Sequence, residues 1–159
     1  MVLVTGMSGS GKSTSLAELA HRGHDALDTD EPGWITRRAG SPGAVPGEPL
    51  WDLDAMETRL GAHRNGFLFV AGCVANQGAL YDRFDAVVLL TAPIDVLLTR
   101  VSRRIDAYGA TVDDRRRIRA DTAGVEPLLR AGASYEIFTT VAVQQVADRL
   151  EGIARRHAH

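Results

Sequence analysis

Residues 6–14, GMSGSGKST, carry the most informative pattern in the chain. They match G-x-x-x-x-G-K-[ST] without a gap, with Lys12 and Ser13 in the last two places. A short apolar run at 2–5 precedes the pattern, and helical spacing follows it. This strand–loop–helix setting is the one in which the pattern forms a phosphate-binding loop. The segment therefore predicts a nucleotide-binding protein of the α/β class.

Lys12 is the only lysine in a chain of 159 residues that otherwise uses arginine. Glycines let backbone N–H groups turn toward phosphate oxygens, and the positive end of the following helix faces the anion. A compact ammonium can reach the β- and γ-phosphates, whereas the wide guanidinium fork of arginine fits poorly. The hydroxyl of Ser13 is expected on Mg²⁺. The residues assigned to nucleotide binding are Gly6, Ser8, Gly9, Ser10, Gly11, Lys12, Ser13 and Thr14.

Apolar runs and helical spacing alternate along the whole chain. Strands are predicted at 2–5, 24–27, 67–71, 86–91 and 135–140, and helices at 12–23, 52–64, from Pro93, from Thr111 to about Ala131, and at 143–156. This alternation predicts one α/β domain over residues 1–159, with a five-stranded parallel sheet flanked by helices. Residues 31–50, rich in proline and glycine, are expected to form an irregular loop.

Composition excludes several functional classes. The net charge of −2 provides no basic field for nucleic acid or a membrane surface. No apolar run reaches the roughly 18 residues of a membrane-spanning helix. The single cysteine, Cys73, excludes an intrachain disulfide, and the chain opens with a strand instead of a signal peptide. We therefore expect a cytoplasmic monomer or homodimer that binds neither nucleic acid nor membrane.

Two kinds of nucleotide hydrolase also fit poorly. The guanine-recognition motif N-K-x-D is absent because Lys12 is the only lysine. An oligomeric ATPase usually has an apolar strand that ends in D-D or D-E. Strands 67–71 and 86–91 end instead in Gly-Cys and Thr-Ala-Pro.

The available carboxylates are Asp28 and Asp30, directly after the second predicted strand. Carboxyl ends of parallel strands line the ligand crevice of such sheets. One carboxylate can serve Mg²⁺ or orient an attacking hydroxyl, and the other can hold the acceptor. The alternative is that both only cap or solvate the loop.

Four segments together resemble the nucleoside monophosphate kinase-like P-loop kinases, with shikimate and gluconate kinases as the nearest pattern. They are GMSGSGKST, LDTDEPGWITRR, FVAGC and VLLTAPIDVLLTRVSRR, and the resemblance spans roughly residues 2–150. It implies ATP and Mg²⁺ as cofactors, with Asp28 near the metal and Asp30 on the acceptor hydroxyl. Where shikimate kinases have three glycines, only Gly72 is present, which argues against shikimate itself.

The break at residues 103–117 is basic, carries a glycine and lies between two predicted helices, which predicts a lid. In the family that the chain resembles, an Arg-x-x-Arg opens the lid. Here this motif is approximated by Arg100 with Arg103 or Arg104. Arg103 or Arg104 is expected to close over the transferred phosphoryl group, and Arg100 to reach adenine or the phosphates. The arginines at 115–119 are expected on a solvated helix face.

Loop 31–50 occupies the position of the acceptor-binding segment in this superfamily. Trp34 is predicted either to pack on an acceptor ring or to anchor the loop, and Arg37 or Arg38 to bind an acidic group. Gly72 and Asn76 are further candidates for acceptor contact, although Asn76 alternatively caps a helix.

We therefore expect an ATP-dependent phosphotransferase that moves the γ-phosphate to a hydroxyl of a small metabolite. Lys12, Asp28, Arg103 and Arg104 are the candidate catalytic residues, and Ser13 and Asp28 the candidate metal ligands. The alternatives are a nucleoside or nucleoside monophosphate kinase, and a nucleotide-binding regulatory module with little transfer.

Overall fold

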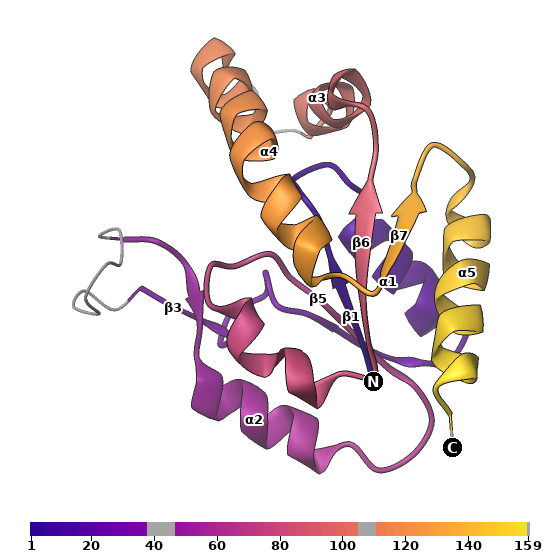
Figure 1. The fold of residues 1–159 in the computed structure, drawn as a ribbon. Helices are drawn as coiled ribbons and strands as arrows, with labels where there is room; N and C mark the ends of the chain where they lie inside the picture. Colours follow the sequence, from indigo (N-terminus) through magenta and orange to yellow (C-terminus); the bar gives the residue numbers. More distant parts are fainter. Residues whose placement is uncertain (38–46, 105–110, 159) are drawn as a thin grey trace.

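Five parallel strands form the central sheet of the computed structural model, which describes residues 1–37, 47–104 and 111–158 (Figure 1). The strands are β1 (Val2–Thr5), β2 (Asp25–Asp28), β5 (Leu68–Ala71), β6 (Ala86–Thr91) and β7 (Tyr135–Phe138). Their order in the sheet is β2-β5-β1-β6-β7, and every pair is parallel. The predicted five-stranded parallel α/β fold is therefore confirmed.

Helices connect successive strands. They are α1 (Lys12–His21), α2 (Leu53–Ala62), the 3₁₀ helix η1 (Gln77–Arg83), α3 (Ile94–Ser102), α4 (Val112–Gly132) and α5 (Val143–Arg156). Two of them begin as the sequence predicts. The Asp52 side chain accepts a hydrogen bond from the Ala55 amide, and Thr111 forms a reciprocal capping box with Asp114. Pro93 lies one residue before α3 instead of inside its first turn.

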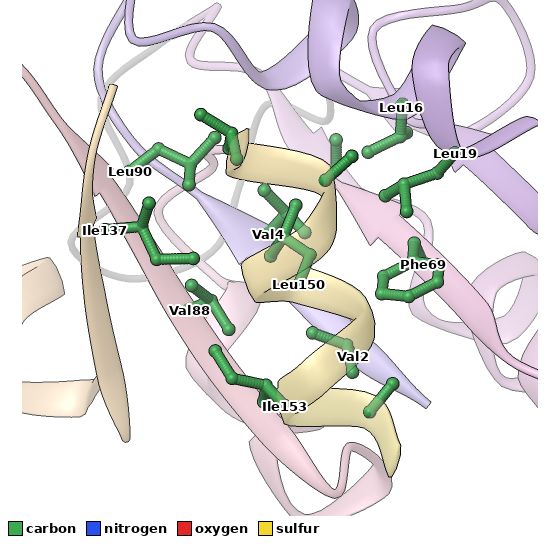
Figure 2. Packing of buried hydrophobic residues seen from close by; sticks show 14 of the residues in the cluster. Val2, Val4, Leu16, Leu19, Phe69, Val88, Leu90, Ile137, Leu150 and Ile153 are labelled. Carbon is green, nitrogen blue, oxygen red and sulfur yellow. The ribbon is translucent and has the colours of Figure 1, made fainter. Parts of the chain in front are cut away.

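The three central strands, β1, β5 and β6, are buried on both sides, so their side chains supply two separate cores. On one face, Val2 and Val4 of β1 pack with α1 and α5, where Leu150 and Ile153 point toward the sheet (Figure 2). On the other face, Leu3 of β1 belongs to a cluster with α2 and η1. This alternation explains why the strand sequences are continuous apolar runs. It also fixes β1, and with it the loop that follows, in the middle of the sheet.

The prediction of an irregular loop over 31–50 is wrong in part. Ile35–Thr36 (β3) and Leu50–Trp51 (β4) pair antiparallel. Trp51 anchors this pair because its side chain is only 1% exposed. The Asn76 side chain accepts from the Trp51 backbone N–H at 2.9 Å and donates to the Trp51 carbonyl at 3.0 Å. Residues 38–46 lie outside the described part of the chain.

Within the described ranges, none of the helices combines the length and the apolar composition needed to cross a bilayer.

Candidate active site

The phosphate-binding loop lies between the end of β1 and the start of α1. Gly9 and Gly11 adopt φ angles of 82° and 98°, a region that side chains with a Cβ rarely enter. Gly9 also packs against α3, where an added Cβ would lie 2.8 Å from the Leu97 carbonyl oxygen. Glycine is therefore required at position 9 both for backbone conformation and for the close approach of α3.

The ammonium of Lys12 lies against the loop itself. Its Nζ donates to the carbonyls of Gly6 at 2.6 Å and Met7 at 3.2 Å. Burial lowers the pKa of the Lys12 ammonium, while Cys73 and the carboxylate of Asp30 act in the opposite direction. Two weak carbonyl partners and a desolvated charge leave this ammonium suited to a phosphate oxygen.

Ser13 and Asp28 meet at the mouth of the loop. Ser13 Oγ donates to Asp28 Oδ2 at 2.5 Å, and the other oxygen of Asp28 accepts from the backbone N–H of Asp30 at 3.1 Å. A hydroxyl and one carboxylate are hard oxygen donors of the kind that hold Mg²⁺ together with phosphates and water. The pair thus fits a nucleotide-bound Mg²⁺. No cluster of three or more His, Cys, Asp or Glu side chains arranged for a metal occurs among the described residues.

A cavity of about 310 Å³ lies on one side of the loop. Its wall includes Gly11, Thr14, Arg100 and Arg104. The Arg100 guanidinium donates to the Gly9 carbonyl at 3.1 Å and to Thr139 Oγ1 at 2.9 Å. Arg100 thereby holds the loop against the turn that follows β7 and leaves a polar wall beside the start of α1.

A larger cavity, about 700 Å³, lies on the other side of the loop. Lys12 and Asp30 line its floor. Its further walls come from the chain before β4, from η1 and the segment preceding it, and from α4. They include Met7, Glu48, Cys73, Val74, Gln77, Tyr81, Asp121, Val125, Leu128 and Leu129. Lys12 thus borders a space large enough for a second substrate.

Cys73 belongs to that wall without being a reactive group. Burial raises the pKa of its thiol, which outweighs the opposite influence of Lys12. Its side chain therefore stays a neutral thiol at pH 7, as a small buried residue would.

Gly72 is not among the residues that line the larger cavity, although its neighbour Cys73 is, and it serves close packing. An added Cβ would lie 2.4 Å from Thr29 Oγ1 and 2.8 Å from Cζ2 of Trp51. Trp51 Nε1 donates to the same Thr29 hydroxyl at 3.0 Å. The glycine predicted to contact the acceptor thus also makes room for the indole.

Four other predicted acceptor residues differ in their placement. Trp34 lines a separate depression beside α2 and packs on the core below it. Arg37 donates to the Gly47 carbonyl at 2.9 Å and lines neither cavity. Asn76 uses its amide on the Trp51 backbone, and Arg38 lies outside the described residues.

The predicted lid is described only at its two ends. Arg103 and Arg104 follow α3 and are exposed, and Arg104 borders the smaller cavity. The Arg104 charge contributes to lowering the pKa of Lys12. Residues 105–110 lie outside the described part of the chain. The arginines at 115–117 are exposed on α4.

Several site residues escaped the sequence analysis. Thr139 follows β7 at the same edge of the sheet as the phosphate loop, so its place at a strand end was a usable signal. Asp121, Val125 and Leu128 share one face of α4 through helical spacing, but only the packing of α4 reveals that this face borders a cavity.

Comparison with known proteins agrees with this geometry. The sequence profile of the AAA domain family matches residues 2–119. Shikimate kinase from Acinetobacter baumannii, solved in complex with shikimate, is 18% identical over 98% of this chain and 92% of that one, with a TM-score of 0.61. Shikimate kinase from Bacteroides thetaiotaomicron is 14% identical over 97% of both chains, with a TM-score of 0.62. TT1252 from Thermus thermophilus is 16% identical over 99% and 97%, with a TM-score of 0.56.

No curated protein matches the sequence significantly. At the identities of the solved structures, the likeness concerns the fold, and it confirms the resemblance to shikimate kinases at that level.

Proposed function

Because the chain belongs to the AAA domain family and has the fold of shikimate kinases, we propose that it is an ATP-dependent small-molecule kinase. In this proposal the γ-phosphate of ATP moves to a hydroxyl of a small metabolite. One observation carries it: the phosphate loop borders two cavities, and Lys12 lines the larger one. A hydrolase needs only water at that point, whereas a kinase needs room for an acceptor.

In the smaller cavity, the nucleotide lies against the start of α1 and its wall of Arg100 and Arg104. The loop amides and Lys12 hold the β- and γ-phosphates, and Ser13 and Asp28 hold Mg²⁺, which neutralises phosphate charge. The 2.5 Å contact between Ser13 Oγ and Asp28 Oδ2 supports the assignment of these two residues to Mg²⁺, because both oxygens already lie close together.

In the larger cavity, Asp30 accepts the hydrogen bond of the acceptor hydroxyl. The hydroxyl oxygen attacks the γ-phosphorus, the bond to the β–γ bridging oxygen breaks, and the hydroxyl proton passes to the Asp30 carboxylate. Arg103 or Arg104 adds positive charge over the transferred group. Positioning and electrostatics do most of the work in such a reaction.

Release of ADP with a panel of hydroxyl-bearing metabolites tests the proposal. We expect Asp30→Asn to lower kcat, because it removes the proton acceptor, and to raise the KM of the acceptor, while the KM of ATP stays nearly unchanged. Asp28→Asn is expected to lower kcat because it acts at the metal. Asp82→Asn, an exposed carboxylate on η1 that lines neither cavity, is the matched control.

Two outcomes separate this proposal from its rivals. Stimulation only by compounds that carry a phosphate favours a nucleoside monophosphate kinase. If ATP binds but no compound stimulates ADP release, the chain is a nucleotide-binding regulatory module.

A further inference from the structure

The larger cavity carries an unusual charge for a site expected to bind a metabolite. Asp30, Glu48 and Asp121 contribute carboxylates to its wall, while Lys12 is the only cation among the described residues that line it. No side-chain hydrogen bond or ion pair to another described residue neutralises Glu48 or Asp121. The Asp30 carboxylate attracts the Lys12 ammonium.

A bound nucleotide also removes Lys12 from this balance of charges, because its phosphate groups pair with the ammonium. Once the ammonium neutralises phosphate oxygens, the charged side chains that remain among the described residues of the wall are all carboxylates. None of the described arginines lines this cavity: Arg37 bonds to Gly47, and Arg100 and Arg104 border the smaller cavity. An acceptor that carries a carboxylate or phosphate would be repelled there.

The rest of the wall includes the polar side chains of Ser8, Gln77 and Tyr81, and an apolar part to which α4 contributes three side chains. Val125 and Leu129 lie one turn apart, and Leu128 beside them is 71% exposed. Met7 and Val74 add apolar surface from the phosphate loop and from the chain before η1. An exposed leucine at the edge of a cavity loses its water when a ligand with an apolar body fills the space.

We propose that the acceptor is an amino alcohol: a compact apolar body that carries the reacting hydroxyl and a protonated amine. The hydroxyl lies at Asp30, the ammonium pairs with the carboxylates of Glu48 and Asp121, and the body packs on the α4 face. This inference rests on the proposed kinase function. It assigns to this chain a substrate class opposite in charge to the shikimate of the A. baumannii complex.

Three acceptors that share one cyclic hydrocarbon skeleton with a single hydroxyl provide the test. One carries an amine, one is neutral and one carries a carboxylate at the same position. We expect kcat/KM for phosphate transfer to be highest for the amine, about tenfold above the neutral compound, and lowest for the carboxylate. Glu48→Gln and Asp121→Asn should each lower kcat/KM for the amine several-fold, and change it less than twofold for the neutral compound. Asp82→Asn should change neither.

Binding of the same three compounds is also measured by calorimetry in the presence of Mg²⁺ and a non-hydrolysable ATP analogue. Tighter binding of the amine without any transfer supports the amino-alcohol site and overturns the kinase. Transfer with the carboxylate as the best acceptor supports the kinase and overturns the amino-alcohol site. If Glu48→Gln affects all three compounds equally, or if none of the three binds, the amino-alcohol site is overturned as well.

Discussion

The Lys12 ammonium is positioned by the carbonyls of Gly6 and Met7, a geometry that the wide guanidinium fork of arginine cannot reproduce. We predict that Lys12→Ala and Lys12→Arg both weaken the binding of ATP-Mg²⁺ at least roughly tenfold, because a charge-assisted hydrogen bond is lost or misplaced. Calorimetric titration measures this, and an unchanged far-ultraviolet circular dichroism spectrum controls for folding. Normal turnover by Lys12→Arg would contradict the argument that the loop needs a compact ammonium.

Gly72 allows a second test at a single position. Gly72→Ala should lower the free energy of unfolding by about 1–3 kcal/mol, because the new methyl group overlaps Trp51 and the Thr29 hydroxyl. Gly78→Ala is the matched control, since no atom lies within 4 Å of its added Cβ. Urea unfolding of both variants measures the difference. Equal stabilities would mean that the indole moves aside at no cost.

The part of the candidate site that could be predicted from sequence is the part encoded by neighbours in the chain. Lys12 and Ser13 belong to one continuous pattern, and Asp28 ends a strand whose edge of the sheet is known once the topology is known. Trp34 was predicted either to pack on an acceptor ring or to anchor the loop, and it packs against the core, while Arg37, predicted to bind an acidic group, lines neither cavity. Their places depend on contacts with distant segments, which no local pattern reports.

Among the secondary-structure elements, long apolar runs and capped helices were predicted to within a residue or two. The pair β3 and β4 was missed because each strand has two residues, too few for any periodicity. What holds it is Trp51, anchored by Asn76 from the segment before η1. Short elements of this kind form through tertiary contacts, so their sequences carry almost no signal.

The contact of α5 with the turn between α1 and β2 supports a prediction about pH. Burial alone would raise the pKa of Glu151, but hydrogen bonds from His24 and Arg22 outweigh it and hold that pKa below the usual 4.5. A carboxylate with a depressed pKa in the folded state stabilises above the pKa of the unfolded state. That stability is lost as pH falls through the folded value.

We therefore expect the free energy of unfolding to fall below about pH 4.5, and to fall less steeply in Glu151→Gln than in the parent. Urea unfolding between pH 3 and 7 measures both slopes, because this range includes the pKa of a free Glu side chain, about 4.3. Asp82→Asn is the control, because that exposed carboxylate has no ion-pair partner among the described residues. Identical slopes in all three proteins would remove Glu151 from acid unfolding.

At the scale of the whole molecule, one arginine on α3 connects the phosphate-binding loop to the turn that follows β7. Arg100 extends from α3 to the Gly9 carbonyl and to Thr139, and the Thr139 hydroxyl donates to the Ser10 carbonyl at 2.8 Å. The loop, α3 and the turn before α5 thus form one hydrogen-bonded unit. A nucleotide that orders the loop is consequently expected to stabilise elements far along the chain.

This connection predicts how ATP changes thermal unfolding. In the parent, ATP-Mg²⁺ at about 100 times its Kd should add about 2.7 kcal/mol to the free energy of unfolding and raise Tm in a single transition. Arg100→Ala should lower Tm without ligand, because the carbonyls of Gly9 and Thr139 lose their donor, and it should also shrink the increase caused by ATP. Arg119→Ala is the matched control, since Arg119 is exposed and its ion pair with Asp95 spans 3.8 Å. Calorimetric scans with and without ATP-Mg²⁺ measure both effects. If Arg100→Ala kept the full increase caused by ATP while losing stability on its own, Arg100 would be a structural tether and not part of nucleotide binding.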